Sequence, residues 1–212
     1  MYTLYYYPGN ASLTPHCLLE ELGVPFSLSL VDRQQDGQRS PAYLALNPHG
    51  QIPTLVDHAL GDLVVYETMA ICLHLVDQVG RLAPDVGTAS RARFYQWMAY
   101  LTNTVQAELM TYFYPERHVV DAAHAPGVKA MAETRLVEMY RGLDAQLGDQ
   151  PFVLGAELSA ADHFLFMLTR WSRNMQTPAR TLANLGRHAE QMMARPAVQR
   201  AFATEKLAAP YY

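Results

Sequence analysis

The pattern of apolar and polar positions divides the chain into two parts, and the first 80 residues alternate short apolar runs with turn residues. Thr3–Tyr7 is typical of a strand closed by Pro8-Gly9, and Phe26–Val31 alternates with the period of two of a second strand. The other elements expected here are helices over 15–22, Pro41–Leu46 and Thr68–Val79, and strands over Thr54–Val56 and Leu63–Tyr66. This order, βαβα then ββα, predicts an α/β domain with a mixed four-stranded sheet.

Beyond Gly80 the pattern becomes helical. Residues 81–89 (RLAPDVGTA) have the composition of a linker, and apolar residues then recur at steps of three and four up to Pro115. Further helices are expected over 127–147, from Ser159 onward, around 180–194 and over 197–206. The sequence therefore predicts an α/β domain over 1–80 and an all-helical domain over 90–212, joined by the linker 81–89.

Composition narrows the class of protein. Half of the 212 residues are hydrophobic, which excludes a disordered chain. The 16 lysines and arginines are outnumbered by 20 aspartates and glutamates, which argues against a nucleic-acid partner. No apolar run approaches a membrane span of about 18 residues, and the first residues lack the pattern of a signal peptide. We expect a cytoplasmic protein with no membrane partner.

Cysteine and histidine give no sign of a metal site. Cys17 and Cys72 are far apart and form no CxxC pair, so we expect two buried apolar thiols. The eight histidines are scattered, and none belongs to an HExxH pattern. We therefore predict no bound metal.

A proline opens the third expected strand, in Gly50-Gln51-Ile52-Pro53-Thr54. Proline cannot donate to a sheet ladder, so this edge should face something other than a neighbouring strand. If the Ile52–Pro53 bond is cis, the backbone of Ile52 can pair with an extended peptide as an added strand would. The alternative is a trans proline that only begins a strand.

Glu67 and Thr68 stand where a strand meets a helix. A helix N-terminus has free N–H groups and a partial positive charge that suit a carboxylate, while Glu67 can accept from an ammonium group. Together these groups fit the zwitterionic end of an amino acid. The alternative is an acidic first turn with a capping hydroxyl.

The loop that follows the first strand carries small and polar residues into the first helix. Its residues Asn10, Ser12 and Thr14 precede or begin a helix whose N-terminus would lower the pKa of a bound thiol. For Ser12 the alternative is a helix-capping or plain loop hydroxyl.

These features together resemble the glutathione transferase family. The resemblance rests on the element order, on QIP before the third strand and on ET at the third helix, and it covers nearly the whole chain. It implies a thioredoxin-like N-terminal domain and a helical C-terminal domain. The segments LYYYPGNASLTPH, NPHGQIPTL, FLFMLTRW and ARPAVQRAF are most similar to the bacterial beta class. Ser159 and Asp162 match the family's capping box, which stabilises the fold.

The chain departs from the beta class at three positions. Ala11 stands where that class has its loop cysteine, so no mixed disulfide with glutathione can form there. Ala99 and Gln106 stand where that class has Asn and His on the helix facing the site. These differences bear on the chemistry and leave the fold unaffected.

The resemblance implies a homodimeric glutathione transferase that transfers glutathione, its co-substrate, to an electrophilic small molecule. The backbone of Ile52 would pair with the cysteinyl part of glutathione, and Pro53 would be needed for this site. Arg33 or His49 would bind the glycyl carboxylate. The γ-glutamyl end would lie at Gln51, Glu67 and Thr68. Asn103 and Gln106 of the helical domain are also expected to bind glutathione. Expected hydrogen-bond donors to the thiolate are, in order, Ser12, Asn10 and Tyr6.

Two other functions stay open at this point. A glutathione-dependent disulfide reductase or peroxidase could use polar loop residues and a second glutathione instead of a protein cysteine. A non-catalytic binding protein could keep the same fold. Activity on an aromatic electrophile, on a mixed disulfide of glutathione, or on neither would distinguish the three.

Overall fold

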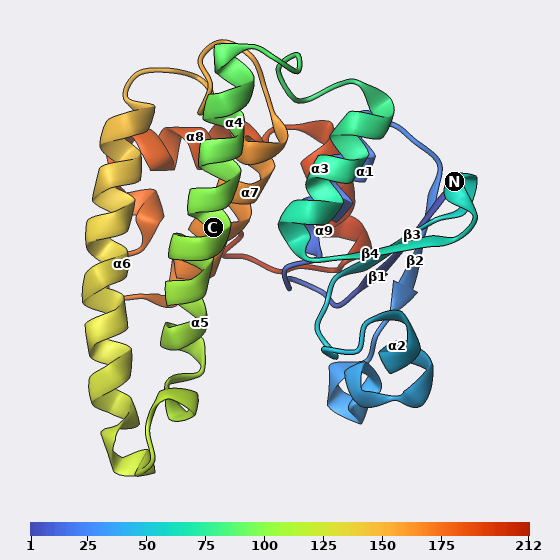
Figure 1. Ribbon diagram of the computed structural model, residues 1–212. Coiled ribbons are helices and arrows are strands. Elements are labelled where there is room, and N and C mark those ends of the chain that lie inside the picture. The colour runs from blue at the N-terminus through green and yellow to red at the C-terminus, as the bar shows by residue number, and fades with distance from the viewer. The chain divides into compact units, whose positions relative to one another are not determined.

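The computed structural model describes all 212 residues, which form two compact units (Figure 1). The first unit comprises Met1–Ala83 and Met193–Ala208, and the second comprises Pro84–Met192 and Ala209–Tyr212. The chain leaves the first unit at Ala83, and the domain bounds expected from the sequence stay a prediction.

A four-stranded mixed sheet forms the centre of the first unit. Its strands are β1 (Tyr2–Tyr6), β2 (Phe26–Leu30), β3 (Thr54–Asp57) and β4 (Leu63–Tyr66), in the order β2-β1-β3-β4. β1 pairs parallel with β2 and antiparallel with β3, and β3 pairs antiparallel with β4. The predicted βαβα-ββα order is confirmed.

Helices cover both faces of this sheet (Figure 1). They are α1 (Leu13–Leu22), α2 (Pro41–Leu46), α3 (Thr68–Val79) and α9 (Pro196–Thr204). In Figure 1, α1, α3 and α9 lie on one side of the sheet and α2 lies on the other. Gly23 and Gly80 end α1 and α3 in the left-handed conformation, and each donates its N–H to the carbonyl four residues back. Glycine adopts this conformation without the steric penalty of a Cβ.

The helix α9 belongs to the first unit, although it lies near the end of the sequence. It packs along α1, and Arg195 and Arg200 pair with Glu21 and Glu20 of that helix. The predicted all-helical domain over 90–212 placed these residues elsewhere. The contact joins segments far apart in the sequence, which helical periodicity alone cannot assign.

The second unit is helical. A long helical stretch runs through α4 (Ala89–Tyr100), a π-helical turn at Leu101–Gln106 and α5 (Ala107–Phe113). The other helices are α6 (Ala125–Leu147), α7 (Ala160–Trp171) and α8 (Ala183–Met193). Figure 1 shows α6 running beside α4 and α5.

The predicted capping box at the start of α7 is present. The side chain of Ser159 accepts from the Asp162 backbone N–H, and the Asp162 carboxylate accepts from the Ser159 N–H at 2.8 Å. The same carboxylate also accepts from the Val153 N–H at 2.8 Å and from His188 Nε2 at 3.1 Å. Through these bonds the Asp162 carboxylate joins three segments of the unit. The side chains of Asp162 and His188 are fully buried.

None of the helices combines the length and the apolar character that a bilayer crossing requires. The structure also contains no group of three or more His, Cys, Asp or Glu side chains arranged to hold a metal ion.

Candidate functional site

The strand directions bring the candidate residues of the first unit to one edge of the sheet. Tyr5 near the end of β1 pairs with Thr54 at the start of β3, and Thr54 pairs with Tyr66 at the end of β4. The segments just beyond these positions therefore meet at this edge. They are the loop into α1, the Gln51–Pro53 segment and the junction at Glu67.

The Gln51–Pro53 segment keeps an unpaired backbone at this edge. Of the two alternatives considered for the Ile52–Pro53 bond, the structure has the cis form, and β3 begins only at Thr54. No hydrogen bond within the protein uses the N–H or C=O of Ile52. An extended ligand can therefore pair with Ile52 as an added strand would.

The carbonyl before Ile52 is held in place by residues that the sequence analysis did not single out. The Tyr43 hydroxyl donates to the Gln51 carbonyl at 2.6 Å, and Asn47 Nδ2 donates to the same oxygen at 2.9 Å. Asn47 is buried, and its Oδ1 accepts the His49 N–H. Asn-Pro in a loop is a signal for such side-chain-to-backbone bonds.

Only glycine fits at position 50. Gly50 has φ of +60°, and a Cβ there would lie 2.8 Å from the Gln38 carbonyl oxygen and 2.9 Å from Arg39 Nη1. The Arg39 guanidinium therefore lies against the loop that carries Ile52. Sequence reasoning named Arg33 and His49 as the cations of this region and missed Arg39.

Glu67 adopts a backbone conformation that is rare for a side-chain-bearing residue. Its φ and ψ are 72° and 121°, immediately before α3. Such outliers cluster at ligand-binding positions. Glu67 is exposed, and Thr68 is buried with its hydroxyl donating weakly to the Ala11 carbonyl at 3.5 Å. The N-terminus of α3 thus lies beside the loop that leads into α1.

Ser12 lies at the N-cap position of α1, as expected, but its hydroxyl is already engaged. The side chain is fully buried; its Oγ donates to the Tyr7 carbonyl at 3.1 Å and accepts from the Tyr7 N–H at 3.2 Å. A hydroxyl has one proton, so Ser12 has none left for a sulfur atom. The place of Ser12 as first thiolate donor stays a prediction, and in this structure its hydroxyl proton is directed to the Tyr7 carbonyl.

Asn10 and Tyr6 each have a hydrogen-bond donor that no bond within the loop uses. Asn10 Oδ1 accepts from the Ala11 N–H at 2.6 Å, which leaves the amide nitrogen as a donor. Tyr6 is half-buried and its ring lies edge-on to that of His16. Burial, and secondarily the nearby Glu205 charge, raise the pKa of the Tyr6 hydroxyl above its ordinary value. Tyr6 therefore stays protonated at neutral pH.

Arg33 and His49, the candidates for a glycyl carboxylate, are both exposed near this edge. The Arg33 guanidinium lies 5.6 Å from the centre of the Tyr7 ring. The His49 ring lies 5.6 Å from the centre of the Tyr66 ring, edge-on. Each of these two side chains therefore lies against a tyrosine ring of the first unit.

Asn103 and Gln106 lie in the second unit, within the π-helical turn at Leu101–Gln106. Asn103 is exposed and Gln106 is partly exposed. π-Helical turns are rare and frequently mark functional sites. The part expected of these two residues in the glutathione site stays a prediction.

A buried contact from the end of the chain fastens the loop into α1. Glu205 Oε2 accepts from the Gly9 N–H at 2.7 Å, and Glu205 Oε1 accepts from His16 Nδ1 at 2.7 Å. Both side chains are fully buried. Sequence reasoning missed this contact, because nothing near Glu205 in the sequence indicates a partner in the first loop.

The two cysteines are buried and free, as predicted. Burial is the main cause that raises the pKa of the Cys17 thiol well above its ordinary value, with Glu205 adding to the effect. Burial likewise raises the pKa of Cys72 far above its ordinary value. Neither thiol is therefore a nucleophile in the folded protein.

Comparisons with known proteins agree with this arrangement. Residues 11–78 match the glutathione S-transferase N-terminal domain, and residues 117–203 match the glutathione S-transferase C-terminal domain. The chain is 29% identical over 208 residues to glutathione S-transferase GstA of Escherichia coli O157:H7, which covers 96% of this chain and 98% of that protein.

Solved structures are similar over nearly the whole chain. A glutathione S-transferase from Xylella fastidiosa has a TM-score of 0.88 and 30% identity, covering 98% of this chain and 100% of that one. A glutathione transferase homologue from Sulfitobacter with bound glutathione has a TM-score of 0.88 and 25% identity, covering 98% and 99%. A beta-class enzyme from Sphingomonas chungbukensis has a TM-score of 0.84 and 28% identity, covering 97% and 100%.

Proposed function

Because the chain belongs to the glutathione S-transferase family, we propose that it binds glutathione in its first unit and transfers the thiolate to an electrophilic small molecule. The observation that carries the proposal is the unpaired backbone of Ile52 at the sheet edge that also holds the N-termini of α1 and α3. A tripeptide with one thiol and two charged ends matches these three features.

Each part of glutathione has a partner at this edge. The cysteinyl backbone pairs with Ile52, and the γ-glutamyl carboxylate accepts from the N-terminus of α3 and the Thr68 hydroxyl. Glu67 and Gln51 accept from the γ-glutamyl ammonium group. The glycyl carboxylate lies near the side chains of Arg33, His49 and Arg39.

The thiol lies at the N-terminus of α1, where we propose Asn10 Nδ2 and the first N–H groups of the helix as its donors. A free thiol has a pKa of about 8.5, and lowering it by two units requires about 2.7 kcal/mol of differential interaction. A helix N-terminus with one or two charge-assisted hydrogen bonds supplies energy of that order. The thiolate sulfur then attacks the electrophilic carbon, a C–S bond forms, and the leaving group departs with its electron pair.

Steady-state assays with two substrates test the proposal. We expect glutathione-dependent conversion of an activated aryl chloride, with the rate reduced about tenfold or more in Asn10→Ala and changed little in Tyr6→Phe. Calorimetry should detect glutathione binding in both variants. Turnover only of a mixed disulfide of glutathione would instead identify a reductase. Absence of both activities and of binding up to 10 mM, equivalent to about 2.7 kcal/mol, would contradict the proposal.

Two further expectations accompany this function. We propose a homodimer as the working form, which light scattering combined with size-exclusion chromatography would measure as twice 23.8 kDa. We also propose a cytoplasmic location, which fractionation of the source cells would test. Family membership supports the homodimer, and the sequence features described above support the location.

A further inference from the structure

A chain of polar side chains crosses the face of the sheet near the start of β1. Thr3 Oγ1 lies 2.8 Å from His58 Nε2, and His58 Nδ1 lies 2.5 Å from Asp62 Oδ1. Ser27 Oγ of the neighbouring strand lies 3.0 Å from Thr3 Oγ1. Thr3 and Ser27 are register partners in β1 and β2, so both hydroxyls project from the same face.

The direction of these hydrogen bonds follows from the chemistry of the groups. An ionised carboxylate only accepts, so His58 carries its proton on Nδ1 and donates it to Asp62. When the ring carries only this proton, its Nε2 atom accepts the Thr3 hydroxyl proton. Hydroxyl, imidazole and carboxylate thus have the relation of nucleophile, base and orienting group.

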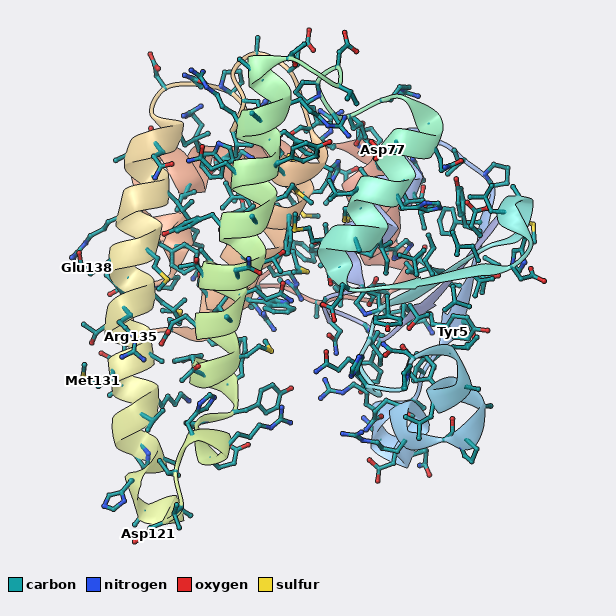
Figure 2. The ribbon with its side chains drawn as sticks, in the orientation of Figure 1. Tyr5, Asp77, Asp121, Met131, Arg135 and Glu138 are labelled. Carbon is teal, nitrogen blue, oxygen red and sulfur yellow. The ribbon has the colours of Figure 1, made fainter.

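A cavity opens on the same face of the sheet, two residues further along β1 and β2. It has a volume of about 230 Å³, and Tyr5, Ser29, Val31, Ala42, Tyr43 and Leu46 line it. Tyr5 and Ser29 are the register pair that follows Thr3 and Ser27 on this face, about 7 Å away. Figure 2 shows Tyr5 near α2, and its ring lies 5.9 Å from that of Tyr43.

We propose that Thr3, His58 and Asp62 form a second catalytic site that hydrolyses small neutral carboxylic esters without glutathione. The mainly apolar cavity holds the acyl chain and places the ester carbonyl over Thr3. Asp32, which also lines the cavity, disfavours anionic substrates. With the Thr3 proton directed to His58, the Ser27 hydroxyl donates to Thr3 Oγ1 and so orients the Thr3 hydroxyl toward His58.

The reaction balances with water as the only co-reactant. Thr3 Oγ1 bonds to the ester carbon while His58 Nε2 takes the hydroxyl proton, and that proton then leaves with the departing alcohol. Water next attacks the acylated Thr3, giving its proton to His58. The carboxylic acid departs, and Thr3 Oγ1 recovers the proton from His58.

This site is separate from the one proposed for glutathione. Side chains alternate between the two faces of a strand, and Tyr6 of the glutathione edge contacts His16 of α1, whereas Tyr5 contacts Tyr43 of α2. Thr3 shares the face of Tyr5. The proposed ester hydrolysis therefore does not depend on the proposed transferase function. An experiment can disprove either proposal without affecting the other.

The test uses the full chain in glutathione-free buffer. Diisopropyl fluorophosphate should form one adduct, on Thr3, in which an O–P bond replaces the P–F bond, fluoride leaves and His58 takes the proton. Peptide mass spectrometry locates the adduct. Hydrolysis of p-nitrophenyl butyrate should fall about 100-fold in His58→Gln, within the range for loss of a general base.

Matched variants separate catalysis from structure. Thr3→Val keeps the shape of the side chain and should abolish both the adduct and the hydrolysis while the melting temperature stays near that of the wild type. His118→Gln alters an exposed histidine of the second unit and should hydrolyse the ester as the wild type does. An adduct on any other residue, or equal hydrolysis by the wild type, Thr3→Val and His58→Gln, would overturn the proposal.

Discussion

Replacing Glu205 by glutamine should destabilise the first unit more than any exposed charge substitution. The Glu205 carboxylate accepts from the Gly9 N–H and from His16 Nδ1, each at 2.7 Å, and the pair with His16 is fully buried. Glutamine retains one oxygen for Gly9 but places an amide N–H₂ opposite the His16 donor. A buried donor then lacks its acceptor.

The size of the effect follows from these contacts. A hydrogen bond to a charged group contributes about 1.5–3 kcal/mol, and a buried donor left without an acceptor costs about 1–3 kcal/mol. We expect Glu205→Gln to lower the free energy of unfolding by about 3 kcal/mol. For a chain of this size that corresponds to a melting temperature lower by about 6–12 °C.

Glu20→Gln is the matched control. Glu20 also joins α1 to α9, through Arg200 Nε at 2.6 Å, but this pair is solvent-exposed. Exposed pairs contribute about 0–1 kcal/mol. Differential scanning calorimetry of the wild type and both variants measures the two effects. A Glu205→Gln melting temperature as high as that of Glu20→Gln would refute the reasoning about the buried contact.

Three further predictions concern other parts of the chain. Replacing Cys17 and Cys72 by alanine should leave the conjugating activity per folded molecule intact. In the wild type, a disulfide reagent should label neither thiol at pH 7–9, because burial raises the pKa of both. Rapid labelling of the native protein would contradict this prediction. Asp162→Asn should lower the free energy of unfolding by about 2–4 kcal/mol, and Ser159→Ala by about 1 kcal/mol, both measured by urea unfolding. Equal losses would contradict the claim that the Asp162 carboxylate stabilises the unit more than the Ser159 hydroxyl does. Gly50→Ala should weaken glutathione binding in calorimetry, because the added Cβ meets backbone at 2.8 Å; unchanged affinity would show that this loop does not shape the site.

Much of the fold could be predicted because its signals are local. Thr68–Val79 and Leu63–Tyr66 have the bounds expected from periodicity and turn residues, and Gly80 ends α3 as expected. The π-helical turn at Leu101–Gln106 was not predicted, because one extra residue per turn barely disturbs an apolar pattern spaced at three and four residues.

The positions of the candidate site residues could be predicted from the sequence, but their hydrogen-bond partners could not. The sequence placed Ser12 at the start of α1, but the engagement of its hydroxyl with Tyr7 depends on how the loop bends back. The contact of Glu205 with Gly9 spans 196 residues, so only the folded chain brings the two together. Sequence patterns specify local elements, whereas tertiary contacts decide which polar groups remain free.

The central claim is that the N-terminus of α1 stabilises the thiolate of bound glutathione, and a titration of that thiolate tests it most directly. Its ultraviolet absorbance is followed against pH with the wild-type protein saturated by glutathione. The account predicts that the bound thiol has a pKa about two units below that of free glutathione, and that Asn10→Ala returns it upward by about one unit. A bound thiol that titrates with free glutathione in the wild type would contradict the account.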